Sequence, residues 1–117
     1  HPMKILRTQI QQMNEGFRRK GIVPFYSSAD LEKIKNKNKV RIAGFVGITQ
    51  RPPTAKGMCF ITLEDESGFI NIVIPPDIYQ RDRLTIYSKS MLEVHGVLEK
   101  NGPITNVKAL KVLPLIL

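Results

Sequence analysis

The chain has 117 residues, a length that suits one domain with one modest hydrophobic core. Hydrophobic residues make up 42% and charged residues 24%, which excludes wholesale disorder, and no apolar run approaches the ~20 residues of a membrane helix. The single cysteine excludes a disulfide framework and a multi-cysteine zinc site. We therefore expect no metal, no cofactor and no membrane partner, and a location in the reducing cytoplasm.

The net charge of +8 is concentrated near the N-terminus. Residues 1–39 hold nine Lys and Arg against three acids, whereas residues 40–117 hold nine against seven. A basic balance of this kind is typical of a protein with a polyanionic partner. The chain does not begin with Met, and its first three residues do not resemble a secretion signal. We therefore expect it to be part of a longer protein.

The N-terminal part is predicted to be a basic helical lead-in. Apolar residues at helical spacing predict a helix over residues 3–13, with an apolar side formed by Ile5, Leu6, Ile10 and Met13. Asn14 would end this helix, and its apolar side is expected to pack on the rest of the domain. Ser27 or Ser28 can cap a second, short helix over residues 29–35.

From Val40 the hydrophobic period changes from 3.6 to 2, which predicts strands. Five strands are expected, over 40–49, 58–65, 69–74, 90–99 and 104–113, with a helix over 77–89. Gly44 and Gly47 are positions where the first strand can bend sharply. Three strands, a helix and two more strands is the order of the five-stranded OB-fold barrel, whereas an SH3-like barrel or a six-stranded sandwich has no obvious place for the helix. We therefore predict a mainly β OB-fold over residues 40–117.

Several strings are more specific than the fold. They are VRIAGFV at 40–46, QRP at 50–52, TAKG at 54–57 and FITLEDESG at 60–68. Together they closely resemble the C-terminal OB domain of the bacterial DNA polymerase III alpha subunit, and the RPPTAKG loop and TLEDESG turn look most like its error-prone paralogue. Pro53 and Ile74 depart from the pattern, because the family usually has Gly and an aromatic residue there. The parent is accordingly either the replicative or the error-prone polymerase.

The OB-fold predicts which face would bind a ligand. In an OB barrel, single-stranded nucleic acid crosses the second and third strands, between the first and fourth loops. Alternation places the aliphatic residues of these strands inside the barrel and leaves on the outer face Phe60, Thr62, Phe69 and Asn71. A base can stack on an exposed aromatic ring, and an asparagine can donate to and accept from a base edge. Alternatively, one phenylalanine fills the barrel or packs under the N-terminal helices.

Three cations are expected to contact phosphate on the approach to this face. Arg51 and Lys56 flank the first loop, and Arg41 lies in the first strand. Residues 40–63 contain no acid, so these cations have no opposing charge nearby in the sequence. Each of them can instead be an ordinary solvated side chain.

Other reactive side chains are interpreted as structural. The acids at 64–66 precede a Ser-Gly turn and are expected to cap it rather than to bind a metal. Cys59 lies among aliphatic residues and is expected to be an inert core thiol, and His95 has no second histidine or cysteine near it in the sequence. The sequence contains no nucleophile–base pairing and no phosphate-cradling glycine loop, so we expect the domain itself to be noncatalytic.

Three functions remain open at this point. The resemblance implies a noncatalytic module that binds single-stranded DNA in a DNA-directed DNA polymerase, acts in DNA replication or DNA repair, and contacts other domains or subunits of the holoenzyme. One alternative is an anticodon-binding domain, because similar domains of aspartyl-type tRNA synthetases use a phenylalanine at the position of Phe60 and a polar side chain at that of Asn71. The other alternative is an OB domain that docks a partner protein.

Overall fold

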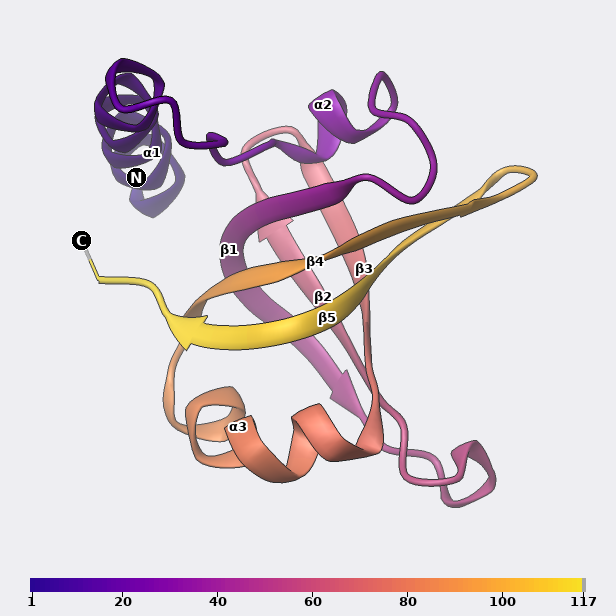
Figure 1. Cartoon of the computed structure of the whole chain (residues 1–117). Coiled ribbons are helices and arrows are strands. Elements are labelled where there is room, and N and C mark those ends of the chain that lie inside the picture. Colours follow the sequence, from indigo (N-terminus) through magenta and orange to yellow (C-terminus); the bar gives the residue numbers. More distant parts are fainter. Residues whose placement is uncertain (117) are drawn as a thin grey trace.

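A computed structural model describes residues 1–116 and contains a closed five-stranded barrel. The strands are β1 (Lys39–Gln50), β2 (Cys59–Asp65), β3 (Gly68–Ile74), β4 (Met91–Asn101) and β5 (Ile104–Pro114). They are joined in the order β1-β2-β3-β5-β4, and all neighbours are antiparallel except β3 and β5 (Figure 1). The helices are α1 (Pro2–Arg19), α2 (Ser28–Leu31), the 3-10 turn η1 (Pro53–Ala55) and α3 (Pro76–Ser88). The predicted OB-fold, with a helix between the third and fourth strands, is confirmed.

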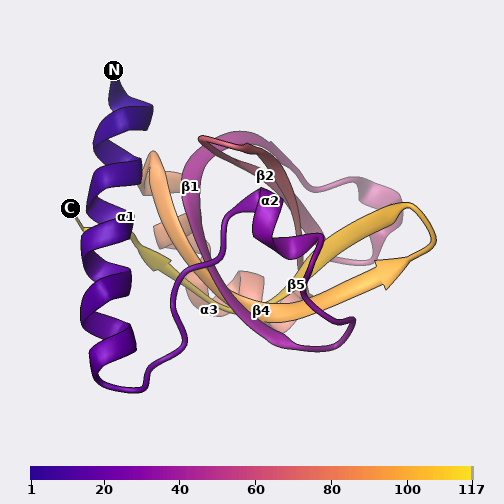
Figure 2. The same ribbon diagram turned by 90° about the horizontal axis from the view of Figure 1, so that it is seen from above.

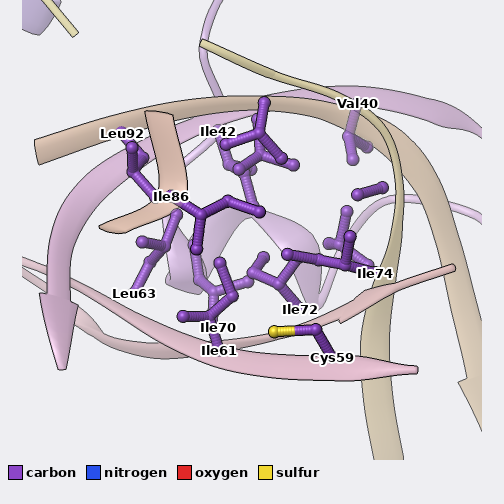
Figure 3. Close-up of a cluster of buried hydrophobic side chains, with 14 of the residues drawn as sticks. Val40, Ile42, Cys59, Ile61, Leu63, Ile70, Ile72, Ile74, Ile86 and Leu92 are labelled. Carbon is purple, nitrogen blue, oxygen red and sulfur yellow. The ribbon is translucent and has the colours of Figure 1, made fainter. Parts of the chain in front are cut away.

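The interior of the barrel is aliphatic, as the alternation predicted. Side chains from several strands and from α3 meet there, and Figure 3 labels Val40, Ile42, Cys59, Ile61, Leu63, Ile70, Ile72, Ile74, Ile86 and Leu92. All of them are buried, and Ile86 extends inward from α3, which closes one end of the barrel (Figure 1). Burial raises the pKa of the Cys59 thiol, against a smaller opposing effect of Arg51, so Cys59 is the core thiol that was expected.

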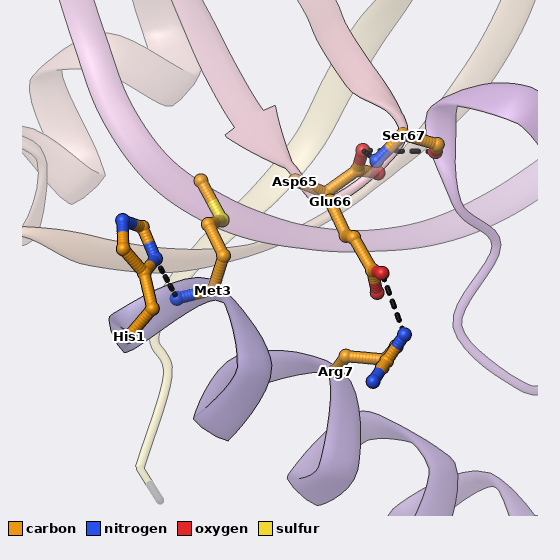
Figure 4. Close-up of polar contacts among 6 residues, drawn as sticks. All are labelled: His1, Met3, Arg7, Asp65, Glu66 and Ser67. Carbon is orange, nitrogen blue, oxygen red and sulfur yellow. Dashed lines mark hydrogen bonds and ion pairs between the residues drawn. The ribbon is translucent and has the colours of Figure 1, made fainter.

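The first helix is longer than the sequence pattern predicted. Pro2 occupies its first turn, and the His1 side chain accepts a hydrogen bond from Met3 N (3.2 Å; Figure 4). The helix does not stop at Asn14, because this side chain bonds to the chain beyond the helix instead of to its own turn. Asn14 Nδ2 donates to Phe25 O (3.1 Å), and Phe25 N donates to Asn14 Oδ1 (2.7 Å). The buried Asn14 thus fixes the segment that follows α1 against the helix.

Helix α1 covers the outer surface of the first half of β1. Leu6 is buried there in a second apolar cluster with Phe25, Ala43 and Leu115. The expected packing of the helix on the domain is correct for Leu6 but wrong for Ile5, whose side chain remains 58% exposed. None of the helices in residues 1–116 is both long and apolar enough to cross a bilayer.

A bulge in β1 changes the face to which its side chains point. The pairing of β1 with β2 shifts between Val46 and Thr49, so Ile48 turns outward and is exposed. A Cβ atom at Gly47 would lie 2.7 Å from Thr62 Oγ1, and Ile48 N donates to the same oxygen (2.9 Å). Glycine therefore permits the close approach that the bend needs, as the two glycines of this strand suggested.

The acidic turn after β2 joins the barrel to α2. Asp65 Oδ1 accepts from the backbone N–H groups of Ser67 (2.9 Å) and Gly68 (3.0 Å), which confirms its turn-capping role. Its other oxygen accepts from Ser28 N (2.7 Å) at the start of α2. The neighbouring Glu66 pairs with Arg7 of α1 (2.7 Å; Figure 4). The helix predicted over 29–35 is α-helical only as far as Leu31, after a capping box at Ser27.

Candidate nucleic-acid interface

The outer face of β2 and β3 carries an open groove of about 290 Å³. Residues that pair directly across neighbouring strands point to the same face. They form rows across the groove, and we call each row a rung. In the first rung Phe60 pairs with Gln50 of β1 and with Val73 of β3. In the second rung Asn71 pairs with Thr62 of β2 and with Asn106 of β5. The outward side chains that line the groove are Ile48, Gln50, Phe60, Thr62, Asn71, Val73 and Asn106.

Phe60 forms part of the groove wall and does not fill the barrel. Its side chain is 37% exposed, whereas the adjacent Ile61 is 2% exposed and lies in the core. The strand register inferred from alternation is therefore correct. The exposed ring has the position that a stacking platform for a base requires.

Two of the three polar residues of the second rung, Thr62 and Asn71, differ in how far their hydrogen-bonding groups are already used. Thr62 Oγ1 already accepts the hydrogen bond from Ile48 N in the β1 bulge (2.9 Å). Its hydroxyl keeps a proton that it can donate, but its position is set by the bulge. Asn71 is exposed, and its carboxamide offers both donor and acceptor groups to the groove. Asn71 is thus the more versatile partner for the edge of a ligand.

Phe69 lies on the same outer face but beyond the groove. It pairs with Glu64 in the third rung, next to the β2–β3 turn, and is 65% exposed. Glu64 is four positions after Phe60 along β2. At about 3.3 Å per residue, the two aromatic rungs therefore lie roughly 13 Å apart. Both rings lie on the outer face that alternation predicted, but only Phe60 lines the groove.

Arg41 is the predicted site residue that the structure places elsewhere. Its guanidinium lies 4.6 Å from the ring centroid of Phe17 and 5.6 Å from that of Phe25, in the layer between α1 and the barrel. Its Nε atom is 4.0 Å from Glu93 Oε2, which also contacts His95 Nε2. Arg41 therefore fixes α1 and does not line the groove, because the outward side of β1 is covered at this position.

Arg51 and Lys56 both belong to the loop between β1 and β2. Arg51 follows Gln50 directly, and its guanidinium stacks 4.3 Å from the centroid of Tyr79 on α3. The hydroxyls of Tyr79 and Tyr87 are 3.0 Å apart, and this hydrogen bond, together with burial, raises the pKa of Tyr87 to about 12. Lys56 is exposed and adopts a left-handed conformation (φ 55°) after η1. Arg51 thus adjoins Gln50 at the border of the groove, and Lys56 lies further along the same loop.

The contributors to this face that the sequence did not predict include Ile48, Asn106 and Lys108. Asn106 lies beside Asn71, and Lys108 beside Val73, because β5 pairs in parallel with β3. Alternation identifies the outward side of each strand, but it does not say which residues of two distant strands become neighbours. Ile48 was missed because the bulge reverses its direction.

Comparison with known families agrees with this geometry. The family described as "OB-fold nucleic acid binding domain" matches residues 40–114, and the chain belongs to this family. The chain is also 63% identical over 115 residues, or 98% of its length, to an error-prone DNA polymerase of Bdellovibrio bacteriovorus. It spans about a tenth (11%) of that relative. The resemblance to the OB domain of this polymerase family is thereby confirmed.

Solved structures with the same fold belong to proteins of different kinds. Asparaginyl-tRNA synthetase of Pyrococcus horikoshii, solved with asparaginyl-adenylate, matches with a TM-score of 0.65 and 17% identity over 80% of this chain and 23% of its own. A small single-stranded DNA binding protein of Mycoplasma pneumoniae matches with a TM-score of 0.55 and 12% identity over 65% of this chain and 91% of its own. At these identities the likeness establishes the fold alone, and the ligand has to be argued from the site.

Proposed function

We propose that this chain is a noncatalytic single-stranded DNA-binding module of a bacterial error-prone DNA polymerase, acting in the cytoplasm during DNA repair or replication beside other domains of the holoenzyme. The observation that carries the proposal is the open groove in which an exposed Phe60 lies next to Asn71 and Asn106. The 63% identity to an error-prone polymerase supports DNA over the tRNA of the synthetases, because only the fold is shared with the latter.

The groove has the side chains that a single strand needs, namely an exposed ring and the carboxamides of Asn71 and Asn106. A splayed base can stack on the Phe60 ring while a carboxamide bonds its edge. Phosphates on either side would reach Arg51 and Lys56 at one border and Lys108 at the other. An exposed base is available only in a single strand, so duplex DNA would not use the ring.

We expect weak affinity with little sequence preference. Stacking on a ring tolerates every base, since each base has a π-face. Residues 40–117 carry nine cations against seven acids, so few counterions are released from the barrel itself. The barrel alone therefore predicts a shallow dependence of affinity on salt concentration.

Fluorescence anisotropy with labelled oligothymidine at several salt concentrations tests the proposal. Phe60→Ala should weaken binding by about 1–3 kcal/mol, the usual worth of one stacked base. Leu84→Ala is the matched control, because Leu84 is an exposed apolar residue on α3, outside the groove. Its affinity should equal that of the unmodified chain.

Duplex DNA and an anticodon stem-loop RNA serve as competing ligands. Absence of binding to oligothymidine at low salt, or a strong preference for the duplex, would contradict the proposal. Tighter binding of the stem-loop would favour the anticodon-binding alternative. Unchanged affinity of Phe60→Ala would remove the groove from the binding site.

A further inference from the structure

The loop between α2 and β1, residues 32–38, is bonded to the end of β4. Lys37 N donates to Leu98 O (2.7 Å), and Leu98 N donates to Asn38 O (2.9 Å). Lys37 has a φ of 72°, so the chain turns sharply at the point of contact. These reciprocal backbone bonds hold the loop beside the β4–β5 hairpin, although the two segments are about 60 residues apart in the sequence.

Lys100 binds the same loop from the hairpin side. Its backbone N–H donates to Asn36 Oδ1 (2.8 Å), and its Nζ donates to Glu32 O (3.0 Å). The loop and the start of the hairpin are therefore fixed by backbone and side-chain bonds together. This arrangement gathers cations that the sequence separates.

We call this cluster of side chains the lysine surface. It consists of Lys33, Lys35, Lys37, Lys39 and Lys100. Lys33, Lys35 and Lys37 lie in the loop, Lys39 is the first residue of β1, and all four are exposed. Lys37 pairs with Glu99 (2.9 Å), whereas none of the ion pairs between described residues involves Lys33, Lys35 or Lys39. Counting Glu32 and Glu99 as opposing charges, the surface keeps a clear positive excess. It accounts for much of the basic balance of residues 1–39.

Strand register connects the groove to the lysine surface. Asn106, which lines the groove, pairs with Glu99 of β4, and Glu99 forms the ion pair with Lys37 (2.9 Å). In Figures 1 and 2 the loop of the lysine surface, the β4–β5 hairpin and the β1–β2 loop all protrude on the right, whereas α1 lies on the left. Phe69, in the third rung, lies beyond the groove at the start of β3. Ile104 begins β5 two residues before Asn106 and is 56% exposed on the same outer side. Ile104 pairs with Asn101, the neighbour of Lys100, so an exposed apolar residue lies between Asn106 and the hairpin end of the lysine surface.

We infer that the lysine surface binds the phosphates of a single strand that leaves the groove past Phe69 and Ile104. The inference rests on the proposed function and extends it, because it assigns a second, electrostatic contact outside the barrel strands. Ligands long enough to cross the third rung would use it, and short ligands confined to the groove would not. It also implies a steeper salt dependence for long strands than the barrel charge alone predicts.

The test compares two triple variants with oligothymidines of about 4 and about 15 nucleotides, the range of OB-fold site sizes. One variant carries Lys33→Gln, Lys35→Gln and Lys39→Gln, and keeps Lys37 because that residue forms the turn. With the long strand its slope of log affinity against log salt should decrease by about 2, or about 0.7 for each lost phosphate contact. With the short strand its affinity should be unchanged.

The control variant loses three cations on the opposite side of the barrel, in Arg18→Gln, Arg19→Gln and Lys20→Gln. These residues lie at the end of α1 and are exposed. The control should bind both strands like the unmodified chain, and circular dichroism should show the same fold for all three proteins. Equal losses in both variants would mean a general charge effect and would overturn the inference.

Two further outcomes separate this inference from the proposed function. If Phe60→Ala weakens binding and the lysine variant does not, the groove binds the strand and the lysine surface does not. If polyglutamate displaces the long strand as well as unlabelled oligothymidine does at equal charge, the surface fits acidic proteins equally and the inference fails. Failure of the unmodified chain to bind any strand would overturn both proposals.

Discussion

The outer surface of β1 has two halves with different surroundings, one covered by α1 and the other open. In the first half Arg41 lies against the rings of Phe17 and Phe25, and Ala43 is buried beneath α1. In the second half Ile48 and Gln50 stay open and form one wall of the groove that contains Phe60. Cations and aromatic rings are present in both halves.

The comparison shows that a cation beside an aromatic ring does not define a binding site. In the covered half the ring faces of Phe17 and Phe25 are occupied by the guanidinium of Arg41, and the apolar side of α1 excludes a ligand. In the open half no described helix lies over Phe60, so its ring remains available. What distinguishes the two is the presence of α1, whose position depends on Asn14 and on the apolar residues around Leu6.

The largest expected effect concerns the inward and outward sides of β2. Ile61→Ala removes a side chain from the aliphatic interior and should cost about 2–5 kcal/mol of unfolding free energy. Phe60→Ala should cost clearly less, because its ring is partly exposed to solvent. Chemical denaturation of the two variants measures both values. A stable Ile61→Ala beside an unfolded Phe60→Ala would mean that the register is shifted by one residue and that the groove face turns inward.

A smaller loss is expected when the attachment of α1 is weakened. Asn14→Ala leaves the backbone N–H and C=O of Phe25 without their partners in a buried position, which should cost about 1–3 kcal/mol of unfolding free energy. Gln12→Ala, at an exposed position of the same helix, should be close to neutral. Thermal melts compare the two variants. Equal melting temperatures would show that Asn14 does not hold the covered half in place.

The barrel could be predicted because the sequence patterns that specify its strands and turns lie among neighbouring residues. Alternation identified the inward residues of β2 and β3, and the order of strands and helix identified the fold. The Ser-Gly turn after the acids at 64–66 similarly predicted a turn cap, and Asp65 is that cap. These features depend on a few neighbouring residues, so a single sequence contains them.

The site was predicted less completely because it depends on contacts between distant residues. Asn14 looked like a helix stop, but its partner Phe25 lies outside the helix. Arg41 was assigned to phosphate contact, since nothing in its own strand reveals that α1 covers it. Lys108 joined the face through the parallel pairing of β3 and β5, which alternation cannot provide.

The smallest expected effects come from exchanging one cation in each half of the comparison. Arg41→Gln removes a cation–π contact in the covered half and should lower the unfolding free energy by about 0.5–1 kcal/mol, with unchanged affinity for oligothymidine. Lys108→Gln, on the open face beside Val73, should weaken the binding of oligothymidine without lowering the unfolding free energy. Its melting temperature should be unchanged, and its slope of log affinity against log salt should decrease by about 0.7. Melts and salt titrations of both variants give four values, and a loss of affinity in Arg41→Gln without a loss of stability would return Arg41 to the ligand path.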